Sequence, residues 1–224
     1  MTSPRRTRLN LPNGDTVSGL FDCPANPQGL LVLAHGAGAG MSHPFLEDLS
    51  RELNSAGIAT LRYQFPYMEK RRKLPDSPAV LTATVREAVN KGGQLAPHLP
   101  LFAGGKSMGG RMTSMAAAEQ PLESVRGLVF FGFPLHPPNR PGTHRGDHLA
   151  RVAVPMLFLQ GTRDAFADLK LLRPICARCG SRARLRTFEG ADHSFHVLKS
   201  SGTSDAGVLR DLVDDVTDWI REIS

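Results

Sequence analysis

The protein has 224 residues, of which 41% are hydrophobic and 21% are charged, a composition typical of an ordinary globular protein with one sizeable core. Its apolar runs at 29–34 and 127–133 are far shorter than the roughly 20 residues of a membrane-spanning helix, so we expect no membrane association. The net charge of +6 permits weak attraction to anions but does not establish nucleic-acid binding, and we expect none.

Three cysteines fit a reducing cytoplasm better than a disulfide framework, and we expect a cytoplasmic protein. Arg5 and Arg6 are not followed by the apolar segment of an export signal. Cys176 and Cys179 form a C-x-x-C pair, but the sequence has no second pair to complete a zinc site. We interpret them as two thiols on one helix, and we expect no metal ion and no organic cofactor.

Strand and helix patterns alternate along the chain. Around the Asn13-Gly14 turn signal, polar and apolar residues alternate as in a pair of N-terminal strands. Further strands are predicted at 29–35, 57–64, 99–104, 125–131, 154–160 and 182–188. Helices are predicted at 44–56, 78–96, 108–119, 167–179 and 204–223. This alternation predicts an α/β fold, with a mostly parallel central sheet flanked by helices, in a single domain over residues 1–224.

Two segments, 64–78 and 132–150, fit neither pattern and are rich in proline, arginine and histidine. Both follow predicted strands, so both belong at the carboxyl edge of the sheet, where α/β proteins bind ligands. Arg71 and Arg72, within a basic cluster at 70–73, are candidate contacts for an anionic group of a substrate. The alternative is a solvated surface loop.

The stretch "GGKSMGG" at 104–110 permits two interpretations. Gly-Lys-Ser ends a phosphate-binding loop, but that loop requires a further glycine five residues before Gly105, where this chain has Pro100. Gly-x-Ser-x-Gly between a strand and a helix instead forms the sharp turn that presents a nucleophilic serine. Gly105 and Gly109 stand where larger residues would clash, so we predict Ser107 as the nucleophile.

A serine nucleophile needs a base, and the base needs an orienting acid. In this class of site the acid precedes the base along the chain, and both follow the serine. Asp164 lies in the polar turn after the strand at 154–160, and His193 lies in the turn after the strand at 182–188. We predict these two as acid and base. The alternatives are Asp168 for the acid and His196 for the base; Asp192 is interpreted as a polar loop residue.

Negative charge on the attacked carbonyl oxygen requires backbone N–H donors. One is predicted to be Met108, directly after the nucleophile, and the other Ala37 in the glycine-rich loop "HGAGAG" at 35–40. Gly38 is the second choice and a candidate substrate contact. His35 is interpreted as fixing this loop by hydrogen bonds.

Together, "HGAGAGMSHPF", "FPYMEKRRKLPD", "GGKSMGG", "GFPLHPP", "QGTRDAF" and "GADHSF" resemble the small dienelactone-hydrolase-like proteins. That group includes the testis-expressed and chromatin-complex hydrolase-like subunits of animals. The resemblance covers about residues 15–222 and implies the α/β-hydrolase fold, with Ser107, Asp164 and His193 as its triad. Ser107 stands where dienelactone hydrolases proper carry cysteine, which argues against dienelactones as substrates.

The sequence thus predicts a serine hydrolase that cleaves a small ester or thioester through an acyl-enzyme. The alternatives are a non-catalytic interaction module with the same fold, and an amidase or peptidase that uses the same triad. The excursion at 133–153 is short, proline-rich and polar, which predicts a minimal lid or none and a preference for short acyl groups. We expect a small-molecule acyl substrate as partner and a monomer or homodimer.

Overall fold

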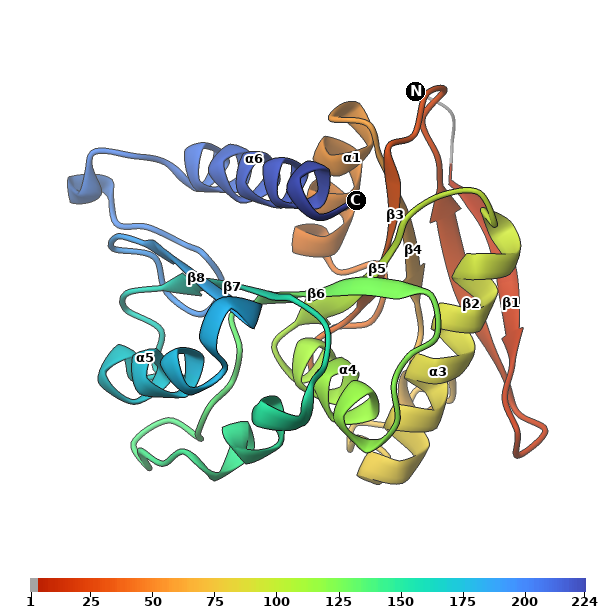
Figure 1. The fold of residues 1–224 in the computed structure, drawn as a ribbon, viewed down its shortest axis with the longest axis horizontal. Coiled ribbons are helices and arrows are strands. Elements are labelled where there is room, and N and C mark those ends of the chain that lie inside the picture. The colour runs from red at the N-terminus through yellow and green to blue at the C-terminus, as the bar shows by residue number, and fades with distance from the viewer. Residues whose placement is uncertain (1–3) are drawn as a thin grey trace.

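The computed structural model describes residues 4–224, and its strands form one eight-stranded sheet in the order β1-β2-β4-β3-β5-β6-β7-β8 (Figure 1). Strands β3 to β8 run parallel, whereas β1 and β2 form an antiparallel hairpin that joins β4 at one edge. The strands are β1 (Arg5–Asn10), β2 (Thr16–Asp22), β3 (Gly29–Ala34), β4 (Ile58–Tyr63), β5 (Leu101–Lys106), β6 (Val125–Phe131), β7 (Met156–Gly161) and β8 (Ala183–Phe188).

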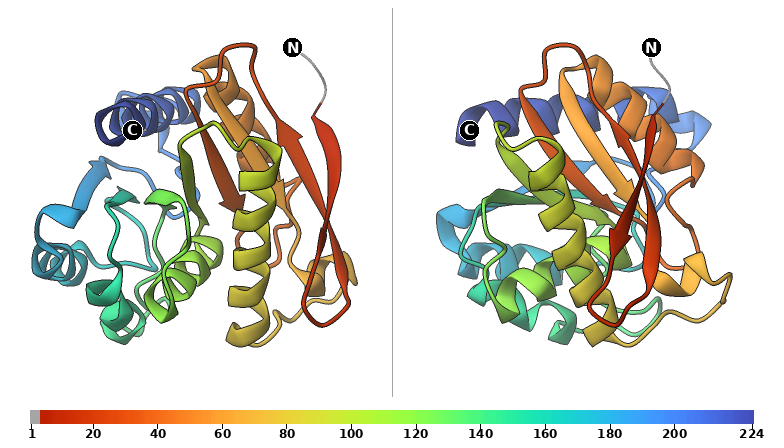
Figure 2. Two further views of the ribbon diagram at one scale, coloured as in Figure 1. Left: turned by 45° about the vertical axis from the view of Figure 1, so that its right-hand side comes forward. Right: turned by 90° about the vertical axis from the view of Figure 1, so that its right-hand side faces the viewer.

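Helices cover both faces of this sheet. Figures 1 and 2 show α1 and α6 on one face and α3, α4 and α5 on the other. The helices are α1 (Pro44–Ser55), α2 (Pro66–Glu69), α3 (Pro78–Leu95), α4 (Met108–Glu119), α5 (Leu169–Arg178) and α6 (Asp205–Ile223), with short 3-10 helices η1 (His144–Arg151), η2 (Gly180–Arg182) and η3 (Lys199–Ser201). The predicted mostly parallel sheet flanked by helices is therefore confirmed.

Two apolar clusters, one on each face, hold the layers together. Every residue of β3 and β4 is buried, as expected for parallel strands covered on both sides. Leu46, Leu49 and Leu53 of α1 pack with α6 against one face. Met112 of α4 and the apolar residues of α3 and α5 pack against the other. Burial of these amphipathic helix faces fixes the sheet edge from which the polar turns project.

The predicted strand and helix boundaries agree with the structure to within two residues. The prediction of two irregular segments was wrong in part, because residues 64–78 contain α2 and residues 132–150 contain most of η1. α2 begins at Pro66, which is favourable at the first helical position and obscures so short a helix in the sequence. η1 is held by Leu149, which is completely buried in an otherwise polar segment.

Cys176 lies in α5 and Cys179 caps its end, as predicted, and both are free and buried. Burial raises the pKa of the Cys176 thiol to about 12, which suits a packed side chain rather than a reactive thiolate. Within residues 4–224 no group of His, Cys, Asp and Glu is arranged to hold a metal ion. The same residues include no helix that is long and apolar enough to cross a membrane.

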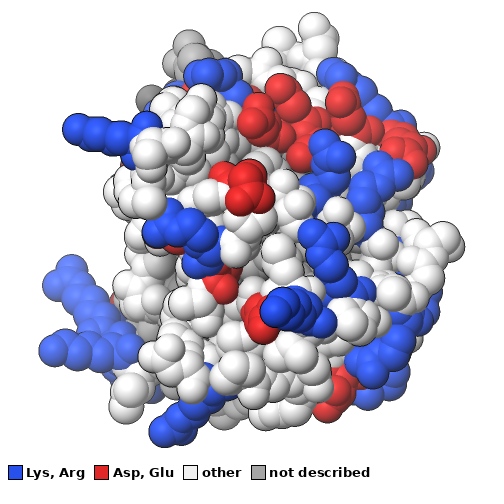
Figure 3. Space-filling model, turned by 90° about the vertical axis from the view of Figure 1, so that its left-hand side faces the viewer, with Lys and Arg blue, Asp and Glu red and all other residues white. Residues whose placement is uncertain are grey.

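Charged side chains of both signs are interspersed on the face shown in Figure 3. Two arginines of β8 are held by carboxylates of α6: Arg184 contacts Glu222 at 2.6 Å, and Arg186 contacts Asp215 at 2.9 Å. All four side chains are partly solvent-exposed, so water and salt screen both pairs and their contribution to stability is small. These arginines therefore belong to the junction of β8 with α6.

Helix α4 approaches the end of β3 so closely that only glycine fits between them. A Cβ on Gly109 would lie 2.5 Å from the Ala34 carbonyl oxygen, and one on Gly105 would lie 2.2 Å from the same atom. Neither backbone element can move without displacing the sheet. By contrast, a Cβ on Gly93 in α3 meets nothing within 4 Å.

We expect Gly109→Ala to lower the free energy of unfolding by at least about 2 kcal/mol, because the added methyl group forces β3 and α4 apart. The same change in the other helix, Gly93→Ala, should raise it by up to about 1 kcal/mol, since alanine favours the helix and the space is open. Urea denaturation of both variants measures the difference. Equal effects at the two positions would contradict the close approach.

Candidate active site

Ser107 lies at the turn between β5 and α4 with φ 50° and ψ −119°, a conformation that L-residues rarely adopt. Its N–H donates to the Phe131 carbonyl of β6 at 3.1 Å, which fixes the turn to the neighbouring strand. The side chain is partly exposed at the carboxyl edge of the sheet. This strand–turn–helix geometry is the one predicted from "GGKSMGG".

The turns after β7 and β8 pack directly against each other and bring Asp164 and His193 to the same edge. Thr162 N–H donates to the Phe188 carbonyl at 3.0 Å, and Arg163 N–H donates to the Ala191 carbonyl at 2.9 Å. Because these bonds are between backbone groups, the two turns are held in a fixed relation before any side chain contributes.

Ser107, His193 and Asp164 form a continuous line of hydrogen bonds. The Ser107 Oγ lies 2.8 Å from His193 Nε2, and His193 Nδ1 lies 2.7 Å from Asp164 Oδ2. An ionised carboxylate only accepts, so Nδ1–H donates to Asp164. Nε2 is then free to accept the hydroxyl proton of Ser107. The structure thus brings the three residues predicted as nucleophile, base and acid into hydrogen-bond contact.

The Asp164 carboxylate is completely buried, with a side-chain exposure of 0%, and it is fully hydrogen-bonded. Gln160 donates its side-chain amide to Oδ2, and the Phe166 N–H donates to Oδ1 at 2.7 Å. The Phe166 ring also lies over His193, with 4.3 Å between the ring centroids. These contacts leave the carboxylate one orientation and cover one face of the imidazole.

The alternative acid and base residues have other partners. Asp168 caps α5 by accepting the Lys170 N–H at 2.8 Å. Asp192 accepts the backbone N–H groups of Ser194 at 2.7 Å and of His196 at 3.0 Å, as a loop residue does. His196 contacts Asp205, the first residue of α6, at 2.8 Å. The structure therefore places none of the three in hydrogen-bond contact with Ser107.

A second serine–histidine contact occurs within the fold. Ser114 Oγ lies 2.7 Å from His148 Nε2, but it also lies 2.9 Å from the Arg111 carbonyl, to which it donates. Ser114 is completely buried in α4, and among residues 4–224 no carboxylate hydrogen-bonds to His148. Burial and the nearby Arg111 and Arg151 lower the pKa of His148 to about 4. His148 is partly exposed, but the Ser114 hydroxyl has no access to solvent and, among residues 4–224, no carboxylate orients the imidazole, so the pair is a packing contact.

The glycine-rich loop lies beside Ser107, where a Cβ on Gly36 would be 3.6 Å from the Ser107 Cβ. His35 fixes this loop as expected: its Nδ1 donates to the Gly36 carbonyl at 2.7 Å, and its Nε2 accepts the Phe65 N–H at 3.1 Å. The Gly38 N–H donates to the Tyr67 hydroxyl at 2.9 Å. Gly38, the second choice as an oxyanion donor, therefore already has an acceptor.

The N–H groups of Ala37 and Met108 have no hydrogen-bond acceptor among residues 4–224. Met108 is the first residue of α4, so its N–H carries the partial positive charge of a helix N-terminus. Ala37 is exposed in the loop that faces Ser107. Both donors are thus available to a bound group.

Arg71 and Arg72 lie in an exposed loop after α2. Arg72 pairs with Asp76, and its neighbour Lys70 pairs with Asp15 at 2.7 Å. These pairs order the loop on the protein surface. No contact within residues 4–224 joins either arginine to Ser107 or His193, and their predicted contact with substrate stays a prediction.

This fold, with a serine–histidine–aspartate line at its carboxyl edge, defines the class of α/β hydrolases. The chain belongs to the alpha/beta hydrolase domain family, whose sequence profile matches residues 27–221. It is also similar to proteins of Mycobacterium tuberculosis named "putative phosphoribosyl transferase", with 28% identity over 208 residues and 91% of this chain covered. The chain spans only 43% of the length of those relatives.

Solved structures show the same fold. A dienelactone hydrolase from Anabaena variabilis has a TM-score of 0.77 and 22% identity, with 99% of each chain covered. A serine hydrolase without a lid from Xanthomonas campestris has a TM-score of 0.77 and 19% identity, with 98% of this chain and 96% of that chain covered. Est1E from Butyrivibrio proteoclasticus, with ferulic acid bound, has a TM-score of 0.75 and 16% identity, with 97% of this chain and 98% of that chain covered. The predicted α/β-hydrolase fold is confirmed, and the dienelactone hydrolase among these structures shares it.

Several residues that shape the site were not predicted from the sequence. Gln160 and Phe166 lie within a few positions of Asp164, but neither belongs to a recognisable motif. Tyr67 lies in the short helix that was predicted as irregular. Lys106 was considered only as part of a phosphate loop. The predicted strand ended at residue 104, whereas β5 extends to Lys106, so alternation from Phe102 places the lysine on the face covered by α1 and α6.

Burial lowers the pKa of His35 from its ordinary value of 6.5 to about 4. Between these two values the unfolded chain binds a proton that the folded chain does not, so stability falls as the pH falls. We expect His35 to account for a loss of about 3 kcal/mol in the free energy of unfolding across this interval. Urea denaturation at pH 7, 5.5 and 4.5 measures it.

In that experiment His35→Gln should be less stable than the wild type at pH 7 but should lose less on acidification. His98→Gln, at an exposed position, serves as the control and should follow the wild type. The same pH dependence in His35→Gln as in the wild type would contradict the assignment.

Proposed function

We propose that this chain is a serine hydrolase that cleaves a small ester or thioester through an acyl-enzyme intermediate. The observation that carries the proposal is the Ser107–His193–Asp164 line of hydrogen bonds, at 2.8 Å and 2.7 Å, with the serine in a positive-φ turn. Membership of the alpha/beta hydrolase domain family supports the reaction class. An ester or thioester substrate is the one predicted from the sequence.

In the first half-reaction the Ser107 oxygen attacks the carbonyl carbon of the substrate, and its proton passes to Nε2 of His193. The Asp164 carboxylate stabilises the imidazolium that forms. Collapse of the tetrahedral intermediate breaks the bond to the leaving oxygen or sulfur, which takes the proton from His193. The product alcohol or thiol departs, and the acyl group stays on Ser107.

Water completes the cycle by the same path. It attacks the acyl carbon while His193 accepts one of its protons, and the imidazolium then returns that proton to the Ser107 oxygen as the carboxylic acid departs. Atoms and charge balance with ester or thioester and water as the only reactants. The proposal needs no metal ion or organic cofactor.

The oxyanion of each tetrahedral intermediate would be held by the N–H groups of Met108 and Ala37. Two observations support this assignment: neither N–H group has a hydrogen-bond acceptor within residues 4–224, and Met108 is the first residue of α4. Donors fixed in advance of the reaction stabilise developing charge without reorganisation. The ring contact between Phe166 and His193 holds the base in place during both steps.

We expect a fluorophosphonate to label Ser107 alone, because only a hydroxyl with a positioned base attacks phosphorus rapidly. Peptide mass spectrometry locates the adduct. Ser107→Ala should abolish both labelling and hydrolysis of acyl esters, while Ser114→Ala should retain both. Absence of an adduct from the wild type, or an adduct on Ser114, would overturn the proposal in favour of a non-catalytic module or a different site.

Matched variants of Asp164 and Asp168 test which aspartate orients His193. Asp164→Asn should lower turnover by up to about 10⁴-fold, the size of the effect in the best-studied triad. Asp168→Asn should change turnover little, because Asp168 caps a helix. A panel of esters, thioesters and amides on the wild type then separates the esterase and thioesterase activities from an amidase.

The substrate is proposed to carry a short acyl group. The excursion at 133–153 contributes its large apolar residues, Phe133, Leu135, Leu149 and Val152, to the core beneath the site, where each is completely buried. Its remaining residues are mostly polar or proline. The segment 133–153 therefore provides no apolar wall above Ser107. A methylene of the acyl chain contributes roughly 0.8 kcal/mol to binding only where such a wall buries it.

We expect kcat/KM to stay within about tenfold from acetyl to decanoyl p-nitrophenyl esters, with the optimum at or below hexanoyl. A full apolar tunnel would instead raise it by about fourfold for each methylene. A steep rise beyond hexanoyl would contradict the open site without contradicting the triad.

A further inference from the structure

Lys106 directly precedes Ser107, but its side chain lies on the other face of the sheet. It is paired in register with Phe131 of β6, whose ring belongs to the apolar cluster under α1 and α6. The Nζ atom donates to the backbone carbonyl of His193. Lys106 therefore connects the residue before the proposed nucleophile to the residue proposed as its base.

Two aromatic rings surround the ammonium group. Nζ lies 5.4 Å from the ring centroid of Phe195 and 5.9 Å from that of Phe45, and these rings are stacked with 5.7 Å between their centroids. A cation at such distances is attracted by the ring faces. The lysine is thus held by three contacts, of which two, to the His193 carbonyl and the Phe195 ring, are to the turn that carries His193.

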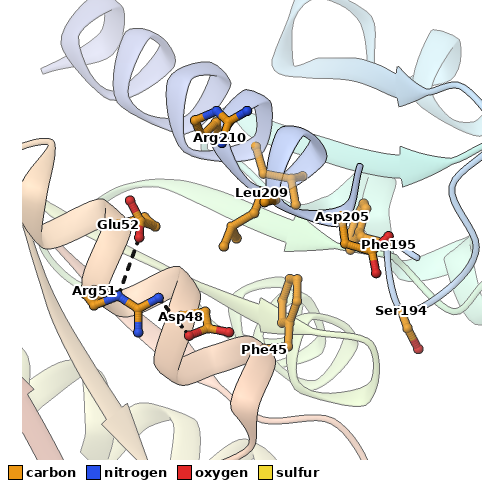
Figure 4. Close-up of a pocket in the computed structure, with 11 residues that line it drawn as sticks. Phe45, Asp48, Arg51, Glu52, Ser194, Phe195, Asp205, Leu209 and Arg210 are labelled. Carbon is orange, nitrogen blue, oxygen red and sulfur yellow. Dashed lines mark ion pairs between the residues drawn. The ribbon is translucent and has the colours of Figure 1, made fainter. Parts of the chain in front are cut away.

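The same two rings separate Lys106 from a cavity of about 420 Å³ between α1 and α6. Figure 4 shows Phe45 on α1 and Phe195, beside Ser194, on the loop that leads into α6. Phe45 and Phe195 line this cavity, but Lys106 does not. The rings therefore lie between the ammonium group and this cavity, although Lys106 as a whole is partly exposed.

Three polar atoms meet beside Gly132 at the end of β6. A Cβ at that position would lie 3.0 Å from Lys106 Nζ, 3.3 Å from His193 Nδ1 and 3.4 Å from Asp164 Oδ2. The lysine charge thus lies close to the hydrogen bond between the imidazole and the carboxylate. Burial lowers the pKa of Lys106 to about 8, while Asp164 and Asp192 oppose this shift, so the group is largely charged at pH 7.

We propose that Lys106 is a positioning residue for His193: it holds the His193 turn by its carbonyl, and its charge opposes protonation of the imidazole. The inference rests on the proposed function, because it assumes that neutral His193 accepts the Ser107 proton. The charged groups around the ammonium are the Asp164 and Asp192 carboxylates. Phe45 of α1 and Phe195 are uncharged. Lys106 therefore places a positive charge beside the buried Asp164 carboxylate.

Three substitutions separate the anchor from the charge. Lys106→Arg keeps both, Lys106→Gln keeps a donor without the charge, and Lys106→Met removes both. The measurements are the pH profile of kcat/KM for an acetyl ester from pH 5 to 9 and the midpoint of thermal unfolding. Lys170→Met, at an exposed position on α5, is the control and should match the wild type.

We expect the acidic limb of the profile to move to higher pH by about one unit in Lys106→Gln and Lys106→Met, and to stay in place in Lys106→Arg. We also expect kcat/KM on the alkaline plateau to fall about 10- to 100-fold in Lys106→Met only, because the His193 turn is released. An acidic limb that stays at the wild-type pH in Lys106→Gln would overturn the charge role.

A plateau in Lys106→Met equal to that of the wild type would overturn the anchoring role, whatever the change in thermal stability. If Lys106→Met does not fold, Lys106→Gln and Lys106→Arg still decide the position of the limb. Fluorophosphonate labelling of the wild type distinguishes failure of the Lys106 proposal from failure of the proposed function. If the wild type is labelled but the acidic limb does not shift in Lys106→Gln, only the charge role of Lys106 is refuted.

Discussion

The close contact between α4 and the end of β3 is the constraint on which the rest of the site depends. Ser107 has a positive φ, which costs of the order of 1–3 kcal/mol and persists only where the surroundings enforce it. The enforcing contacts are those of Gly105 and Gly109 with the backbone of Ala34. Ala34 ends β3 and leads into the glycine-rich loop, so the same contact sets the distance between Ser107 and the free N–H of Ala37.

The acid and the base are positioned by a second and separate device. The backbone bonds between the turns after β7 and β8 do not involve β5 or α4. They hold Asp164 and His193 as one unit. The line to Ser107 closes because β5, β6, β7 and β8 are neighbours in a parallel sheet and because Lys106 at the end of β5 contacts the His193 carbonyl. Sheet twist and register thus control the distance from Ser107 Oγ to His193 Nε2, while local turns control the distance from His193 to Asp164.

The sequence predicted these elements well because their signals are local. Buried parallel strands read as apolar runs, the helices have clear apolar faces, and polar turns at strand ends mark the sheet edge. Ser107, Asp164 and His193 could be chosen because each lies in the turn that follows a predicted strand. Tyr67 and Phe166 could not, because their contacts join segments that no periodicity connects. The two proline-rich segments concealed α2 and η1, since each is anchored by only a few buried residues.

The direction of the Lys106 side chain also explains why "GGKSMGG" resembles a phosphate-binding loop without being one. In a phosphate-binding loop the lysine projects toward the ligand, on the same side as the backbone N–H groups. Here it is the last residue of a regular strand, so alternation sends its side chain to the face opposite the glycines that meet Ala34. On that face the lysine meets two phenylalanines, a carbonyl and the surroundings of a buried carboxylate. Its amine therefore belongs to the support of the His193 turn, and the serine beside it is left to face the solvent.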